Sequence, residues 1–445
     1  MLGVVGCVAD MGTGGQEEAT LTVWRWVLAI GSALVVAAAA ATTAWVHHSA
    51  QTRAQRAVAA AQTLLRVYYS PNFGLLADTP GAATTADAGN LFPTGPMRPT
   101  AMWGYSWALD ALQEAERLPG GGVLAQPVQL LNQHLQEYWV AGASPPAYAP
   151  YPFQGPSTLK YHDDNAWAGL DLERAWRQTG NAADLRQAEA VFRYLQSGWD
   201  PNGGGIYWND NPQGRNTAAT APSAELASRL YLDTHQVDDL VWAKKIYAWE
   251  VANLVDPSTG AVWDTLQADG TISKNQYTYN EGTVIGAAAL LYRITGARPY
   301  LVQAERTFND VLNTLVHTVH GQPDILVPQP FFNGVLADDL VLLYRVDPDP
   351  RIVRLLDANA QAAWRRARDP RTGLIGSNWA GPPPQDPATQ AILVQTGAVR
   401  VLAADARVHT LGMTLKRWLH PGPRVPVPVC RPTSLYQGAA QNCGS

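Results

Sequence analysis

A repeat with a period of roughly 55 residues runs from about residue 52 to residue 408, and it limits the possible folds more than any other feature of the chain. Three segments align through a turn in which Arg is followed by Thr-Gly or Asp-Pro: LERAWRQTGNAADLRQAEAVF, LYRITGARPYLVQAERTF and LYRVDPDPRIVRLLDANA. A second turn recurs as SPNFG, DPNGG, DPSTG and DPRTG. Because Pro and Gly end helices and form turns, each repeat is predicted to be a pair of helices.

Assembling these signals predicts six helix pairs. The first helices are amphipathic at helical spacing and are expected to form an outer ring, near 53–68, 125–138, 182–197, 239–254, 299–316 and 351–367. The second helices are richer in Ala, Leu and Gly, as expected of buried inner helices, near 101–117, 164–178, 217–233, 280–294, 333–346 and 388–404. This alternation predicts an all-α (α/α)6 barrel. A linear solenoid of helix pairs is the alternative, and ring closure alone separates the two.

The composition narrows the class of partner. A formal net charge of -5 without long basic runs argues against a nucleic-acid binder, which would cluster Lys and Arg. The chain has 16 Trp and 17 Tyr but only 7 Phe, so its aromatic residues mostly carry a polar group. Such rings stack on the apolar faces of sugars, but Trp also fills helical cores, so the count alone decides nothing.

The N-terminal region carries an export or anchor signal. Residues 26–46 contain no charge and are long enough to cross a bilayer, for which about 20 apolar residues suffice. We interpret them as an uncleaved transmembrane anchor, with a signal peptide cleaved near residues 42–44 as the alternative. The predicted organisation is a segment 1–25, the anchor 26–46, a catalytic barrel 50–410 and a Pro-rich tail 411–445. Cys430 and Cys443 in the tail are either a disulfide or two free thiols.

The loops that follow the outer helices all lead into inner-helix N-termini, so they are expected to meet at one end of the ring. Loops held by a rigid scaffold commonly carry functional residues. The polar and aromatic side chains predicted to bind substrate at this end are Trp103, Tyr105, Tyr161, Trp208, Asn216, Tyr279, Asn280, Glu281, Asn333 and Trp379.

Three Asp-Asp pairs occur, and the repeat separates them. Asp163-Asp164 opens the second inner helix, at the candidate end. Asp238-Asp239 lies in a turn at the opposite end, where it is interpreted as an N-cap. Asp338-Asp339 lies deeper in an inner helix, either as a core hydrogen-bonding pair or at the bottom of the cleft. We expect Asp163, Asn216, Asn280 and Asn333 to converge on one mouth, with Asp238 at the far end.

Helix capping is the plain interpretation of Asp163 and Asp164, since acids are favoured at helix N-termini. Capping explains one Asp better than two. Adjacent carboxylates resist simultaneous ionisation, so one is expected to stay protonated while the other is charged. That division supplies the proton donor and the nucleophile of a retaining glycosidase, whose carboxyl groups lie about 5 to 5.5 Å apart.

Three segments, taken in order, resemble glycoside hydrolase family 76, the endo-α-1,6-mannanase family with its fungal transglycosylase relatives. They are YHDDNAWAGLDLERAWRQTG, GGGIYWNDNPQGRNTAATAPSAELASRLY and YTYNEGTVIGAAALLYRITG, and the resemblance runs from about residue 54 to residue 405. It implies that Asp163 is the nucleophile and Asp164 the general acid/base. The family's Tyr-Asn-Gln-Gly matches residues 279–282, except that Glu281 replaces Gln.

The resemblance implies an enzyme that hydrolyses or transfers α-1,6-linked mannose chains of an envelope polysaccharide or lipoglycan. Residues 26–46 predict that it is tethered to the membrane with its barrel outside the cytoplasm, or secreted if that segment is cleaved, and we expect a monomer. No metal or cofactor is expected, because the nine His are scattered and no His or Cys cluster has ligand spacing. Two rivals remain: another (α/α)6 glycosidase that uses Glu281 as its acid, and a non-catalytic glycan-binding envelope protein. Cleavage rather than binding of an α-1,6-mannooligosaccharide separates the enzyme from the second rival.

Overall fold

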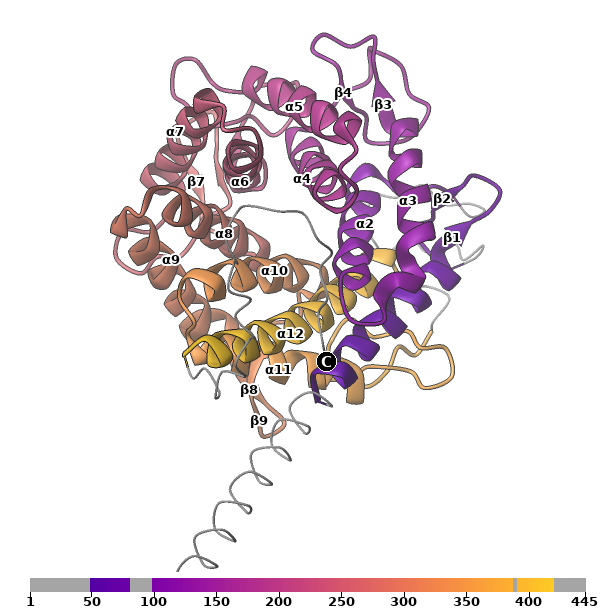
Figure 1. Ribbon diagram of the computed structural model, residues 1–445. Helices are drawn as coiled ribbons and strands as arrows, with labels where there is room; N and C mark the ends of the chain where they lie inside the picture. Colours follow the sequence, from indigo (N-terminus) through magenta and orange to yellow (C-terminus); the bar gives the residue numbers. More distant parts are fainter. Residues whose placement is uncertain (1–48, 81–97, 387–389, 420–445) are drawn as a thin grey trace, which may run out of the picture.

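The computed structural model describes residues 49–80, 98–386 and 390–419 (Figure 1). The predicted anchor at 26–46 and both tail cysteines lie outside these ranges. Within them, no helix combines the length and the hydropathy that crossing a bilayer requires.

The described part of the chain is a closed ring of alternating inner and outer helices (Figure 1). The inner helices are α2 (Met102–Glu116), α4 (His162–Thr179), α6 (Thr217–Thr234), α8 (Thr278–Thr295), α10 (Pro330–Val346) and α12 (Ile392–Leu419). The outer helices are a first helix over 49–68, α3 (Ala125–His134), α5 (Ala182–Ser197), α7 (Val237–Leu254), α9 (Arg298–Asp310) and α11 (Pro350–Arg365). Each inner helix packs on the next, and α12 packs on α2. This last contact closes the ring, so the barrel is confirmed and the linear solenoid is excluded.

Short strands decorate one end of the barrel. They form antiparallel pairs β1–β2 (Tyr69–Ser70 and Leu75–Leu76), β3–β4 (Trp139–Val140 and Ala147–Tyr148) and β8–β9 (Val316–Val319 and Gln322–Leu326), and the three-stranded β5–β6–β7 (Arg215–Asn216, Thr265–Leu266 and Ile272–Ser273). Short 3-10 turns flank α3, as η1 (Gly121–Leu124) and η2 (Leu135–Tyr138), and a π turn, η3 (Val311–Leu315), ends α9. Every strand pair contributes to a connection from an outer helix to the next inner helix, so all lie at the end where inner helices begin.

Small residues allow the inner helices to approach closely. A Cβ at Gly397 of α12 would lie 1.9 Å from the carbonyl oxygen of Pro330, and one at Gly334 of α10 would lie 2.8 Å from Gly397 Cα. Only glycine therefore fits at this crossing, and the Ala- and Gly-rich composition that suggested an inner ring has a direct packing reason.

Buried ion pairs occupy the barrel axis below the inner-helix N-termini. Arg400 binds Asp338 through Nε at 2.6 Å and Asp110 through Nη2 at 2.7 Å. Arg174 Nε lies 2.9 Å from Glu114 Oε1 and also pairs with Asp110. Buried charges are tolerated only when paired in this way. Asp338 is thus part of a structural network, so of the two interpretations of the Asp338-Asp339 pair the core-bonding one applies to Asp338.

Candidate active site

Asp163 and Asp164 lie in the first turn of α4, at the end of the barrel that carries the strand pairs. The N-cap residue is Tyr161, whose side chain makes no capping bond. Both aspartate side chains are partly exposed. The described contacts therefore do not use Asp164 to cap the helix, and its carboxyl group is available to a ligand.

Hydrogen bonding distinguishes the two carboxyl groups. Asp163 Oδ2 accepts from the indole Nε1 of Trp208 at 2.8 Å, and its Oδ1 accepts from the backbone N–H of Asp164 at 2.9 Å. Burial raises the pKa of Asp163 to about 6, and these two donors limit the rise. Burial and the charge of Asp163 raise the pKa of Asp164 well above its usual range. The pair is thus unequal: the two hydrogen bonds favour the charged form of Asp163, and the neighbouring charge favours the protonated form of Asp164.

An aromatic side wall flanks the pair. The rings of Tyr161 and Trp208 meet edge to face at 5.1 Å, and the backbone N–H of His162 donates to Trp208 O at 2.8 Å. The His162 ring stacks on Tyr194 and fits against Gly198, where a Cβ would approach it to 2.4 Å. These contacts hold the N-terminus of α4, and hence the pair, against the loop that carries Trp208.

A second aromatic wall comes from α2, α8 and α10. Trp103 and Trp107 are one helical turn apart and pack edge to face at 5.4 Å, while the Tyr279 ring lies 4.4 Å from Phe332. Tyr279 lies in the first turn of α8, at the same end of the barrel as Asp163 in the first turn of α4. Burial raises the pKa of the Tyr279 hydroxyl well above its usual range, and the charges of Asp264 and Asp163 raise it further. Sequence reasoning missed Phe332.

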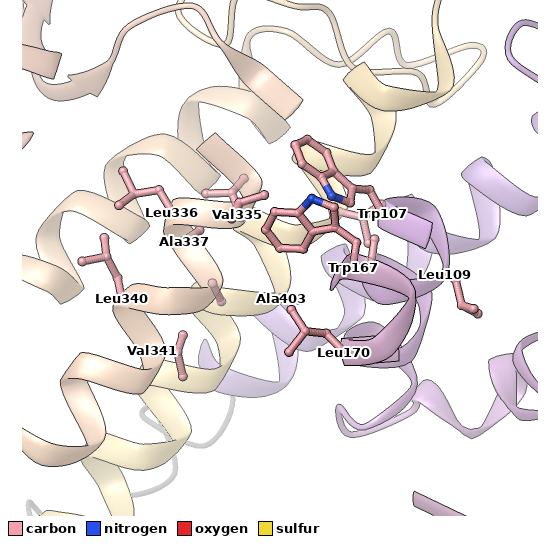
Figure 2. Close-up of a cluster of buried hydrophobic side chains, with 14 of the residues drawn as sticks. Trp107, Leu109, Trp167, Leu170, Val335, Leu336, Ala337, Leu340, Val341 and Ala403 are labelled. Atoms are coloured by element: carbon pink, nitrogen blue, oxygen red, sulfur yellow. The ribbon is translucent and has the colours of Figure 1, made fainter. Parts of the chain in front are cut away.

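Below this wall the barrel is filled. Trp107 of α2 meets Trp167 of α4 edge to face at 5.3 Å, opposite Val335, Leu336 and Leu340 of α10 (Figure 2). Trp167 lies one turn after Asp163 on the same helix, a spacing that could have identified it as the floor beneath the pair.

A cavity of about 340 Å³ opens beside Trp208, which is 46% exposed. Amide side chains dominate its lining, which consists of Trp208, Asn209, Asn211, Gln213, Gly214, Asn216, Thr265 and Gln267. Asn216 Oδ1 caps α6 by accepting from Ala219 N, and no described contact uses its Nδ2. Amides and an exposed indole suit sugar hydroxyls and sugar faces.

Glu281 has a structural role that recurs around the ring. In four inner helices, the side chain of the fourth residue accepts a hydrogen bond from a backbone N–H of the segment that connects the preceding outer helix to that inner helix. The pairs are Asn165 with Tyr148 at 2.8 Å, Thr220 with Ile206 at 3.2 Å, Glu281 with Val262 at 3.0 Å and Gln395 with Ile375 at 3.0 Å. Glu281 is fully buried, and burial raises its pKa well above its usual range. A protonated Glu resembles Gln, the residue at the equivalent place in α12.

Four more of the residues predicted to bind substrate are buried: Tyr105, Asn280, Asn333 and Trp379. The Tyr105 hydroxyl donates to Leu131 O at 2.8 Å, toward outer helix α3. Asn333 is 1% exposed, accepts from Thr278 Oγ1 and donates to Val327 O, which leaves no group for a ligand. Trp379 is 4% exposed. Asn280 is fully buried beside the partly exposed Asp264. Burial raises the pKa of Asp264, and the Asn280 amide limits that rise.

The other acidic pairs lie away from this cleft. Asp238 and Asp239 begin α7, at the far end as predicted, but in the first turn rather than at the N-cap, which is Gln236. Asp339 is buried beside Glu225, whose charge helps raise its pKa. One acidic cluster of the described residues, Asp357 with Asp405 and His409, has the spacing of metal ligands. Arg53 already pairs with both of its carboxylates, at 2.8 and 3.1 Å.

Fold and site together define an (α/α)6 barrel with a carboxylate pair in an aromatic cleft, the architecture of a sugar-processing enzyme. The sequence model of glycosyl hydrolase family 76 matches residues 52–409, and the chain belongs to this family.

Relatives and solved structures agree with that assignment. Mannan endo-1,6-alpha-mannosidase DCW1 of Saccharomyces cerevisiae is 28% identical over 251 residues, which are 50% of this chain and 56% of that protein. The DCW1 protein of Candida glabrata is 30% identical over similar shares. The chain thus spans about half the length of these curated relatives.

Two bacterial structures share the fold. The family 76 mannosidase Bt3792 of Bacteroides thetaiotaomicron superposes with a TM-score of 0.71 at 24% identity, over 81% of this chain and all of that one. An inactive variant of the alpha-1,6-mannanase of Salegentibacter sp., with two consecutive aspartates replaced, was solved with alpha-1,6-mannotriose; its TM-score is 0.66 at 23% identity, over 80% and 99% of the two chains.

Proposed function

We propose that this chain is a retaining endo-α-1,6-mannanase that acts on a mannan or lipoglycan of the cell envelope. The observation that carries the proposal is the unequal pair. Asp163 accepts two hydrogen bonds that favour its charged form, whereas the Asp164 carboxyl accepts none from the described residues and lies beside that charge. The names of the family relatives support α-1,6-linked mannose as the substrate.

The proposed reaction has two steps. The Asp163 carboxylate attacks C1 of the sugar while Asp164 donates its proton to the departing glycosidic oxygen, which breaks the C1–O bond and forms a mannosyl ester on Asp163. Asp164, now ionised, then takes a proton from water as the water attacks C1 and releases Asp163. A sugar hydroxyl that replaces the water gives transglycosylation instead.

The cleft supports an endo-acting enzyme. The amide-lined cavity is bordered by Trp208, whose indole N–H donates to Asp163 Oδ2, and the aromatic wall of Trp103, Tyr279 and Phe332 stands on other helices at the same end of the barrel. These two surfaces support the binding of sugars on more than one side of the pair. We also propose that the barrel lies outside the cytoplasm, carried there by residues 26–46, because envelope mannan is found there.

Incubation of the protein with α-1,6-mannotetraose and, separately, with α-1,2-mannotetraose tests the proposal. Proton NMR is expected to show cleavage of the α-1,6 substrate alone, with the α-anomer of the product appearing first. An Asp163→Asn/Asp164→Asn variant is the inactive control. Binding without cleavage would support the glycan-binding alternative, and initial release of the β-anomer would exclude retention.

A further inference from the structure

A second cavity lies at the far end of the barrel, where the inner helices end. Its volume is about 60 Å³, room for a few waters or a small oxyanion, since one water needs about 10 to 15 Å³. Of the described residues that line it, seven are arginines and only two, Glu114 and Asp338, are acidic. The cavity is therefore strongly cationic.

The repeat itself creates this arginine cluster. The Arg of the recurring turn falls at the end of an inner helix each time, as Arg177 in α4, Arg293 in α8 and Arg345 in α10. Arg117 follows α2 directly as its C-cap. Because the inner helices are parallel members of one ring, these side chains converge on the axis. The catalytic cleft at the other end uses none of them.

Most of the lining arginines have carboxylate partners. The pairs include Arg174 with Asp110 and Glu114, Arg177 with Glu173 and Asp233, Arg229 with Glu173 and Glu225, and Arg407 with Glu114 and Asp338. Arg117 lies 3.5 Å from Glu114, which it shares with Arg174 and Arg407. The available carboxylates are thus already divided among these groups.

Arg293 and Arg345 make no ion pair or hydrogen bond within the described part of the chain, although both line the cavity. Burial and then the charge of Arg407 lower the pKa of Arg345 to about 10. A guanidinium that stays without a counterion among other guanidinium groups is an unfavourable arrangement, and an anion in the cavity would relieve it.

Helix capping does not account for these two side chains. Cations are favoured at helix C-termini, and an arginine that caps a helix can donate to its last carbonyls. Neither Arg293 nor Arg345 donates to a carbonyl of the described residues. The ends are capped by backbone instead: Gly296 N donates to Tyr292 O at 2.8 Å in α8, and Asp347 N donates to Leu343 O at 2.8 Å in α10.

We propose that the arginine-lined cavity at the far end of the barrel is a binding site for a phosphate group, held by Arg293, Arg345 and Arg117. Guanidinium groups bind phosphate oxygens through parallel N–H donors, and Arg117, Arg293 and Arg345 are exposed enough for a ligand to reach them from solvent. The phosphate comes either from solution or from the headgroup of an anionic lipid.

Calorimetric titration of the full-length chain with inorganic phosphate, at constant ionic strength in sodium chloride, tests the site. The wild type is expected to bind one phosphate saturably, and Arg293→Gln/Arg345→Gln to bind at least tenfold more weakly. The matched control is Arg186→Gln/Arg298→Gln, which removes the same charge from exposed outer-helix positions at the same end and is expected to bind like the wild type. Thermal melts establish that both variants are folded.

Glycerophosphoglycerol, a deacylated lipid headgroup, replaces inorganic phosphate in a second titration. Tighter binding than inorganic phosphate, lost in Arg293→Gln/Arg345→Gln, assigns the site to a lipid headgroup, and weaker binding assigns it to free phosphate. Absence of saturable binding by the wild type in both titrations overturns the proposal. So does a folded Arg293→Gln/Arg345→Gln variant that binds phosphate with wild-type affinity.

Discussion

Replacing Trp208 by Phe removes the indole N–H that donates to Asp163 Oδ2 at 2.8 Å while keeping an aromatic ring beside the cleft. A hydrogen bond to a charged group contributes about 1.5 to 3 kcal/mol. Trp208 is 46% exposed, so water partly replaces the lost donor, and we expect a net loss of about 1 kcal/mol. Because 1.36 kcal/mol corresponds to one pKa unit, the pKa of Asp163 should rise by about 0.7.

The pH dependence of kcat/KM measures this shift, since it reports the essential groups of the free enzyme. Asp163 must be charged to attack, so its pKa sets the acidic limb, which should move from about 6 to about 6.7. At about pH 5.5 the variant should be about fourfold slower from ionisation alone, and near pH 8 this difference should vanish.

Trp249→Phe is the matched control, because Trp249 Nε1 donates to Gly203 O at 2.7 Å, away from the pair. Its acidic limb should stay at the wild-type position. If Trp208→Phe lowers kcat/KM equally at every pH, the indole serves the substrate only, and the reasoning about the charge state of Asp163 is refuted.

Three further predictions test roles in the framework. Glu281→Gln should retain activity and raise the melting temperature more at pH 8 than at pH 5. Burial raises the pKa of Glu281, so its carboxyl group favours folding below the unfolded pKa, and that contribution is lost as the pH rises through the folded pKa. A folded but inactive variant would favour Glu281 as the acid. Arg174→Met should lower the unfolding free energy by about 3 to 5 kcal/mol in denaturant melts, since it leaves buried carboxylates unpaired, and a neutral effect would contradict the ion network. Tyr105→Phe should cost about 1 kcal/mol of stability through the lost bond to Leu131 O and leave KM unchanged, whereas a raised KM would return Tyr105 to the cleft.

The helices were predictable because the repeat and the turn residues mark their ends. The inner helices begin within about four residues of their predicted starts, a normal uncertainty for helix ends. The end of α12 was predicted wrongly. This helix extends to Leu419, well beyond the predicted end at 404, because no Gly or Pro turn stops it there. Outer helix α9 ends early, at Asp310, where a π turn replaces its last turn.

The site was less predictable because sequence position does not show where a side chain points. Trp103 and Trp107 share a helix face, whereas Tyr105 lies two residues on, about 200° around the helix, and therefore faces α3. Asn333 and Glu281 are polar and lie at the correct end, but other parts of the ring already use them. Asn333 accepts from Thr278 at the start of α8, and Glu281 accepts from Val262 in the loop before α8. Only the folded ring reveals that these polar groups are already used.

The central claim is that Asp163 is the nucleophile and Asp164 the acid/base, and trapping the covalent intermediate tests it most directly. The Asp164→Ala variant is reacted with α-1,6-mannobiosyl fluoride, whose fluoride leaves without needing a proton, and the product is quenched, digested and mapped by mass spectrometry. Without a general base the second step is slow, so one mannobiosyl unit is expected on Asp163, and added azide should remove it as the mannobiosyl azide. A label on Glu281, or no label with wild-type turnover in both Asp163→Ala and Asp164→Ala, would contradict the assignment.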